Sequence, residues 1–372
     1  MRPSVPTSPP RRDLFPCSLH KHVLDHLGVS SVAVAIGGSM GGMAVLEWPL
    51  CSPPGYIRHI IPLATSARHS AWCISWGETQ RQCIYSDPSY EDGYYITQPS
   101  SGLSAARMAA LLTYRSRDSF ESRFGRRPQV ADPPHGKPIT PLALSAADQA
   151  LIAHNEGHQR ASRPQSQAQS PSQTAPHSPV SEGPSTAHTP PPVFSAQSYL
   201  RYQGAKFVAR FDANCYIHIT RKMDTHDLAR GRGVLANKNT NGHTPPASAS
   251  NCDADTDSDP QSIALATVLA TLPPRALVIS IETDGLFTPT EQRHLATHIP
   301  GAALVVIPSP DGHDGFLLEF EQINRHVLAF LKRELPGYYV DEGGDEGGNG
   351  EEDFAIKKTS LFGEAEVDVT RW

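Results

Sequence analysis

Short apolar runs alternate along this chain with longer stretches in which apolar residues recur at helical spacing. The runs at 32–36, 57–64, 276–281 and 303–307 predict strands that are buried on both faces. Helical spacing is found at 20–27, which Gly28 ends, and at 103–114, 291–298 and 316–335. Strands that alternate with helices in this way predict an α/β fold with a mostly parallel sheet.

The predicted elements divide the chain into a core and a helical part. Residues 19–70 and 261–335 hold the four expected strands and would form the core. Residues 71–132 and 193–230 have helical patterns and lie between the second and the third strand. We therefore expect a helical subdomain that is inserted into the core.

Other segments have compositions that oppose folding. Residues 133–192 and 233–260 are rich in Pro, Ser, Thr and Ala, and the second ends in an Asp-rich stretch. Residues 336–372 contain a Gly, Glu and Asp run. Such segments bury too little apolar surface to offset the entropy of ordering them. We predict two disordered insertions and an acidic C-terminal tail.

Composition narrows the class of protein. The net charge of −6 gives no electrostatic reason to expect nucleic acid or an anionic membrane as a partner. No apolar run approaches the length of a membrane span, and residues 1–12 lack the apolar region of a secretory signal. The six cysteines are scattered without a C-x-x-C pair, which is typical of reduced thiols. We expect a soluble cytoplasmic protein.

A serine flanked by glycines directly follows the first predicted strand. The sequence GGSMGG at 37–42 places Ser39 between this strand and an apolar, helix-like stretch at 43–48. This is the G-x-S-x-G arrangement in which a sharp strand-to-helix turn exposes a nucleophilic serine. Backbone N–H groups at the helix start, here that of Met40, can stabilise negative charge. The alternative is a purely structural glycine-rich turn.

A serine hydroxyl needs a base, and the base needs an orienting acid. Asp284 follows the strand at 276–281, and His313 follows the strand at 303–307 in a loop with glycines on both sides. Both therefore lie beyond the carboxyl ends of strands, where ligands bind in open α/β sheets. Glu282, two residues earlier, competes with Asp284 for the role of the acid.

Six sequence blocks together resemble the homoserine O-acetyltransferase family, and its fungal members most closely. The blocks are IGGSMGGM with LEW at 36–48, ARHSAW at 67–72, ETQRQ at 78–82, FDANCY at 211–216, GHDGF at 312–316 and KTSLFGEAE at 358–366. The resemblance implies an α/β-hydrolase fold with a helical lid at 71–132 and 193–230. It also implies that acetyl-CoA acetylates the serine and that the hydroxyl of L-homoserine then takes the acetyl group, a step of methionine biosynthesis.

The resemblance assigns further roles by motif. Ser39 would be the nucleophile, His313 the base and Asp284 its partner. The substrate carboxylate would bind Arg107, in the block GLSAAR at 102–107, and the substrate amine would contact Asp314. The family needs no cofactor or metal beyond its co-substrate, and it pairs through the lid, so we expect a homodimer.

Two further features concern the substrate pocket and a polar cluster. The resemblance also makes Tyr114, in the block LTY at 112–114, a candidate for the pocket. The cluster DTHD at 224–227 looks like a metal site, but the resemblance places it at the junction of lid and core.

The chain departs from the family before the serine. Only 38 residues precede Ser39, where the family has many more, and residues 1–18 match nothing in it. We therefore expect a truncated sheet of about four strands without the loop that donates the second oxyanion N–H group. Two alternatives stay open: a related acetyltransferase acting on serine or another alcohol, and an impaired fragment that acts only by pairing through the lid.

Overall fold

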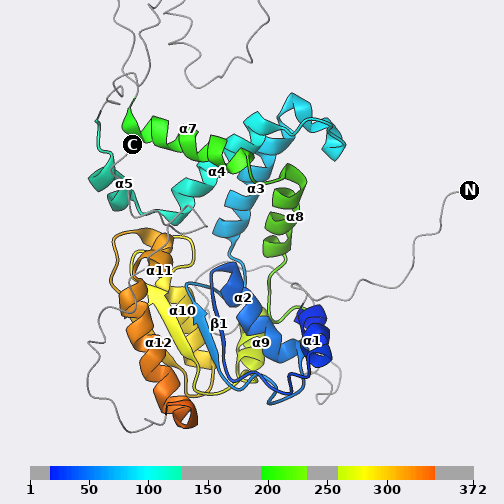
Figure 1. Ribbon diagram of the computed structural model, residues 1–372, viewed down its shortest axis with the longest axis vertical. Helices are drawn as coiled ribbons and strands as arrows, with labels where there is room; N and C mark the ends of the chain where they lie inside the picture. Colours follow the sequence, from blue (N-terminus) through cyan, green and yellow to red (C-terminus); the bar gives the residue numbers. More distant parts are fainter. Residues whose placement is uncertain (1–16, 128–193, 233–258, 340–372) are drawn as a thin grey trace, which may run out of the picture.

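The computed structural model describes residues 17–127, 194–232 and 259–339 (Figure 1). The insertion expected at 133–192, and nearly all of the segments expected at 233–260, 1–18 and 336–372, lie outside these residues; the last two residues of 233–260 belong to the start of a helix. Within the described ranges, one sheet has the strand order β1-β2-β3-β4, and its neighbouring strands are parallel. The strands are β1 (Ala35–Gly38), β2 (Ile60–Leu63), β3 (Leu277–Ile281) and β4 (Ala303–Ile307).

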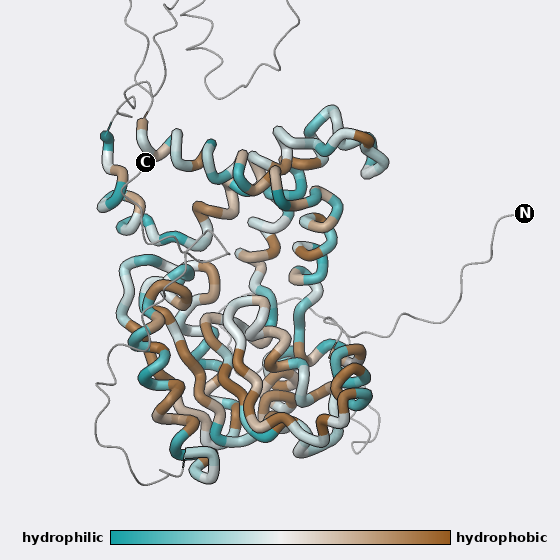
Figure 2. Tube along the Cα trace, viewed as in Figure 1, coloured by the Kyte–Doolittle hydropathy of each residue, from teal (hydrophilic) through white to brown (hydrophobic). Residues whose placement is uncertain are grey.

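Helices cover both faces of the sheet. One hydrophobic cluster joins one face to α2 (Met40–Glu47), α9 (Pro260–Leu269) and α10 (Pro289–His298). A second cluster joins the other face to α12 (Phe320–Glu334). Hydrophobic residues are concentrated in these layers (Figure 2). The result is the α/β architecture with a four-stranded parallel sheet that the sequence predicts.

A separate group of helices comes between β2 and β3 in the chain, where the sequence predicts the lid, and we use that name for it. Its elements are α3 (Ala71–Tyr85), η2 (Pro88–Gly93), α4 (Ser100–Tyr114), α5 (Arg117–Arg123), α7 (Ser195–Val208) and α8 (Ala213–Asp224). These helices lie beyond one end of the sheet (Figure 1). Because α4 packs against η5 (Gly312–Asp314), which follows β4, this is the carboxyl end of the strands.

Side-chain caps begin several of these helices. The Ser70 hydroxyl accepts a hydrogen bond from the backbone of Cys73 at the start of α3, and Asp212 accepts from Cys215 at the start of α8. Thr288 and Glu291 form a capping box at the start of α10. The remaining elements are α1 (Cys17–His26), η1 (Trp48–Cys51), α11 (Gly315–Leu318) and η6 (Pro336–Tyr338).

Three expected elements differ from the structure. The run at 32–36 is not a fully buried strand: β1 starts at Ala35, lies at the edge of the sheet and leaves Ile36 47% exposed. The run at 303–307 forms β4 at the other edge of the sheet, and it too is only partly buried, with Val306 44% exposed. The helix expected at 316–335 is divided at Glu319, whose backbone (φ −87, ψ 37) is not helical, into α11 and α12. Of the helices in the described ranges, none combines the length and the apolar character of a membrane span.

Candidate active site

Ser39 occupies a strained turn between β1 and α2. Its φ of 57° and ψ of −125° are unusual for a residue with a side chain. The backbone is held by hydrogen bonds from Ser39 N to Leu63 O (3.0 Å) and from Thr65 Oγ1 to Ser39 O (2.8 Å). A Cβ at Gly42 would lie 2.6 Å from the Cβ of Thr65, so the close approach of α2 to the next strand requires glycine there.

The structure brings Ser39, His313 and Asp284 into one hydrogen-bonded chain. The distance from His313 Nε2 to Ser39 Oγ is 2.9 Å, and the distance from His313 Nδ1 to Asp284 Oδ2 is 2.7 Å. A carboxylate only accepts, so Nδ1 carries the proton, and Nε2 is left to accept the proton of the serine hydroxyl. This is the arrangement of a nucleophile, a general base and an orienting acid.

The two acidic candidates after β3, Asp284 and Glu282, differ in their burial and in their contacts. Asp284 is buried, and its Oδ1 accepts hydrogen bonds from the backbone N–H groups of Leu286 (2.8 Å) and Phe287 (2.9 Å). Glu282 is exposed and makes no recorded contact with His313. Only Asp284 is therefore placed to orient the imidazole.

The imidazole of His313 has an apolar surrounding. The ring of Phe287 lies 5.3 Å from it and the ring of Phe316 lies 5.1 Å from it, measured between centroids. Met40 follows the serine as the first residue of α2, and the N–H groups of a first helical turn have no partner within the helix. Its N–H group therefore has no partner within the helix, and its role as an oxyanion donor stays a prediction.

The three predicted substrate residues lie where α4 meets the turn that carries His313. Arg107 and Tyr114 belong to α4, and Nη1 of Arg107 donates a hydrogen bond to the Tyr114 hydroxyl. The guanidinium of Arg107 is buried and lies 4.8 Å from the centroid of the Phe207 ring. Asp314 directly follows His313 and forms an ion pair with Arg115. The structure thus brings Arg107 and Tyr114 together, and it places Asp314 and the backbone of Tyr114 at the turn that carries His313; their roles toward a substrate stay predictions.

Comparison with known proteins identifies the family. The model of the α/β hydrolase fold matches residues 12–320. The homoserine O-acetyltransferase of Cryptococcus neoformans var. grubii is 50% identical, over all of this chain and 77% of that protein. That of Emericella nidulans is 44% identical, over all of this chain and 74% of that protein. The chain belongs to the homoserine O-acetyltransferase family.

Solved structures show the same fold at low sequence identity. The homoserine O-acetyltransferase from Bacillus anthracis aligns with a TM-score of 0.57 at 15% identity, over 86% of this chain and 65% of that one. Esterase E22 aligns with a TM-score of 0.52 at 17% identity, over 85% of this chain and 65% of that one. Since transferases and esterases share the fold, the fold by itself does not fix the acceptor.

In this homoserine O-acetyltransferase family member, the DTHD cluster at 224–227 connects the lid to the core. Asp224 pairs with Arg81 (2.6 Å), His226 Nε2 bonds Ser66 O (2.8 Å), and Asp227 pairs with Arg68 (3.3 Å). An isolated bridge between Arg68 and Asp227 joins the two backbones. These contacts place the cluster at the junction of lid and core.

Cys73 lies in the same wall of the site but is not a competing nucleophile. Its thiol is buried against Met43 and Phe287 and donates to Leu286 O (3.1 Å). Burial raises the pKa of Cys73 to about 11, so the thiol stays protonated and unreactive. Burial, with the nearby charge of Asp284 as a smaller cause, also raises the pKa of Glu291 to about 7.

Sequence reasoning missed the residues that connect the lid to the catalytic loop. Arg115 pairs with both Asp311 and Asp314, and the Ser119 hydroxyl donates to Asp311 (2.7 Å). The only signal in the sequence was the high density of arginines at 115–127. That pattern does not say which of them faces the loop.

Proposed function

We propose that this chain transfers an acetyl group from acetyl-CoA to the side-chain hydroxyl of L-homoserine, through an acetyl-Ser39 intermediate. The observation that carries the proposal is the hydrogen-bonded chain from Ser39 through His313 to Asp284. Membership of the homoserine O-acetyltransferase family supports the choice of donor and acceptor.

In the first half-reaction, Ser39 Oγ attacks the thioester carbonyl while His313 Nε2 takes the hydroxyl proton. The Met40 N–H group stabilises the oxyanion of the tetrahedral intermediate. When the C–S bond breaks, the imidazolium gives its proton to the departing thiolate, so CoA leaves as the thiol and Ser39 carries the acetyl ester. Asp284 stabilises the imidazolium throughout.

In the second half-reaction, the homoserine hydroxyl gives its proton to His313 Nε2 and attacks the acetyl ester. The ester bond to Ser39 breaks, and the proton returns to Oγ, which restores the serine. Arg107 would bind the substrate carboxylate in two parallel hydrogen bonds, with the Tyr114 hydroxyl beside it, and Asp314 would bind the ammonium group. The lid helices exclude water, which would otherwise hydrolyse the intermediate.

The proposal is tested by the mass of the protein after incubation with acetyl-CoA alone. We expect one added acetyl group on the peptide that contains Ser39 and none in the folded Ser39→Ala variant. Addition of homoserine should then remove the group and yield O-acetylhomoserine. Folded protein that gains no acetyl group would refute the proposal.

The acceptor is tested in parallel reactions with homoserine and serine at equal concentration. If free serine removes the acetyl group from Ser39 faster than homoserine does, the alternative of a related acetyltransferase that acts on serine is favoured. The buried Arg107 and the ion-paired Asp314 fit any acceptor that carries both a carboxylate and an ammonium group. They therefore disfavour simple alcohols.

We further propose that the protein acts in the cytosol as a homodimer that pairs through the lid. All five cysteines of the described residues are free thiols, which suits a reducing compartment. At the tip of the lid, beyond η2, Tyr94 and Ile96 are 87% and 99% exposed. Large apolar side chains at such a tip are typical of a protein contact.

A further inference from the structure

The turn that carries His313 is supported from the core on one side. Thr283 Oγ1 donates to Ser309 O (2.7 Å) and accepts a hydrogen bond from Gly312 N (2.9 Å). Asp311 N donates to Ser309 Oγ (3.2 Å). These bonds fix the backbone where the turn leaves β4, but they do not reach the carboxylates of the turn.

Support from the lid reaches those carboxylates. Arg115 follows the last residue of α4, and its Nε lies 2.9 Å from Asp314 Oδ2 while its Nη1 lies 2.9 Å from Asp311 Oδ1. The hydroxyl of Ser119 donates to the same Oδ1 of Asp311 (2.7 Å), and that of Ser116 donates to Pro310 O. One guanidinium therefore contacts a carboxylate on each side of His313.

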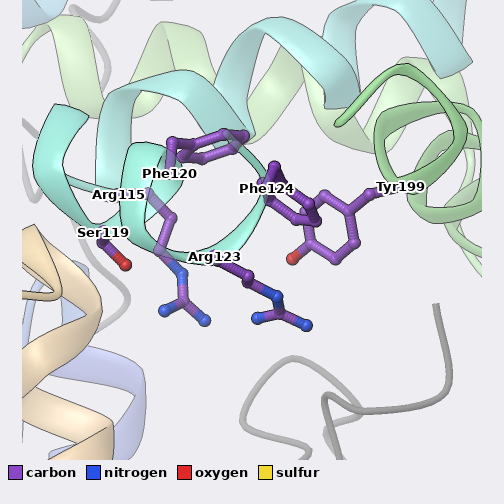
Figure 3. A pocket seen from close by; sticks show the side chains of 6 residues that line it. All are labelled: Arg115, Ser119, Phe120, Arg123, Phe124 and Tyr199. Atoms are coloured by element: carbon purple, nitrogen blue, oxygen red, sulfur yellow. The ribbon is translucent and has the colours of Figure 1, made fainter. Parts of the chain in front are cut away.

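The lid backbone also lies directly against the turn. Gly312 has a φ of +69°, and a Cβ there would be 2.5 Å from Ser116 N. Arg115 and Ser119 line a small open pocket together with three aromatic rings and Arg123 (Figure 3). The guanidinium of Arg123 stacks at 5.0 Å from the centroid of the Tyr199 ring, and no ion pair is recorded for it within the described ranges.

The position of Arg115 makes its contacts strong. Its side chain is only 9% exposed, so its ion pairs are less screened by water than pairs on the surface. A guanidinium is a planar fork whose nitrogens can hold two carboxylates in fixed directions at once, which a lysine ammonium does not do. Removing it would leave two acidic side chains without their shared cation.

We infer that Arg115 is a positioning residue, which orients the Asp314 carboxylate and fixes the His313 turn only while the lid is docked on the core. The inference rests on the proposed function, in which Asp314 binds the ammonium group of the acceptor. Acceptor binding and the geometry of the catalytic base are thereby coupled through one side chain of the lid.

Hydrogen exchange of the unliganded protein tests the structural half of this inference. Arg115→Gln should speed the exchange of backbone amides at 311–316 about tenfold or more, with exchange in β3 unchanged. Arg117→Gln is the matched control, because Arg117 lies two residues away, is 84% exposed and, among the described residues, forms its ion pair with the similarly exposed Asp118. The amide exchange rates of Arg115→Lys at 311–316 should lie between those of the parent and those of Arg115→Gln. Equal exchange in Arg115→Gln and the parent would overturn the inference, and so would the same increase in Arg117→Gln.

Kinetics test the functional half. Arg115→Gln should raise the KM for homoserine and lower kcat about 100-fold, while Arg117→Gln keeps both. In a double-mutant cycle, the KM effects of Arg115→Gln and Asp314→Asn should be less than additive, because one residue acts through the other. Additive effects would overturn the inference. Absence of acetyl transfer in the parent would refute the proposed function, whereas the exchange experiment would still decide the role of Arg115.

Discussion

At the scale of single residues, substitutions can test which carboxylate orients His313, that of Asp284 or that of Glu282. Asp284→Asn keeps the shape of the side chain, but the amide nitrogen is a donor and favours the wrong tautomer of the imidazole. We expect acetylation of Ser39 to slow by about 10⁴-fold, as measured by single-turnover mass spectrometry. Glu282→Gln is the matched control, since Glu282 is exposed two residues earlier. Equal loss in the two variants would contradict the assignment.

Two glycines of the serine turn should respond in opposite directions to the same substitution. Gly42→Ala would place a Cβ 2.6 Å from Thr65 and should destabilise the fold by roughly 1–3 kcal/mol. Gly41→Ala meets nothing within 4 Å and, inside α2, should stabilise by about 0.5–1 kcal/mol. Urea unfolding of both variants measures the free energies. A destabilised Gly41→Ala would show that the turn tolerates no side chain at either position.

The sequence predicts the triad residues because each of them follows a strand and lies beside glycine, which is a local pattern. Ser39 and His313 are 274 positions apart, yet parallel strands bring their carboxyl ends to one edge. Arg115 was not predicted, because its partner Asp311 lies 196 residues away and belongs to a different part of the fold. Only the docking of the lid on the core brings these two residues together.

At the scale of elements, the same limit explains the two misjudged strands. The runs at 32–36 and 303–307 have the composition of buried strands, but burial depends on the neighbours that a strand receives. Within the described residues, β1 and β4 each have a neighbouring strand on one side only. The break at Glu319 was equally hidden. Residues 316–335 keep one apolar period across it, so the pattern alone does not reveal the change of direction between α11 and α12.

The junction of lid and core contains two buried histidines that should make stability depend on pH. Burial lowers the pKa of both His69 and His226 to about 4, and for His69 the nearby His226 and Arg81 add to the effect. Unfolded histidines take up protons near pH 6.5, so between pH 6.5 and 4 the unfolded chain binds more protons than the folded one. The two buried, neutral histidines therefore make their full contribution to the free energy of unfolding above pH 6.5. This contribution is lost as the pH falls towards 4.

The prediction is checked by urea unfolding at several pH values. Each histidine contributes at most about 3 kcal/mol, and His69→Gln should reduce the loss of stability between pH 6.5 and 4. At pH 8 histidine is neutral in the folded and in the unfolded protein. The difference in the free energy of unfolding between His69→Gln and the parent at this pH therefore reports only the change in packing. An equally steep loss in His69→Gln and the parent would exclude His69 as a cause.

At the scale of the whole molecule, exposed apolar side chains occur at several places among the described residues, and two of these places are candidates for a dimer contact. One is the lid tip with Tyr94 and Ile96, and the other is the stripe of Leu19, Val23 and Leu27 in and just after α1. The stripe has the spacing of one helix face, so its three side chains form one exposed apolar surface. Exposure alone therefore does not say which surface pairs, and the family resemblance favours the lid.

A pair of charge substitutions decides between the two surfaces. Ile96→Asp places a carboxylate at the lid tip, and if the tip is buried in a dimer the unpaired charge should dissociate it. Leu27→Asp, at a residue that is 68% exposed, makes the same change on the other surface and should leave the dimer intact. Light scattering coupled to size-exclusion chromatography measures the mass of each variant. A parent protein that is monomeric at all concentrations, or a dimer that only Leu27→Asp dissociates, would contradict pairing through the lid, because the apolar tip would then remain exposed to water.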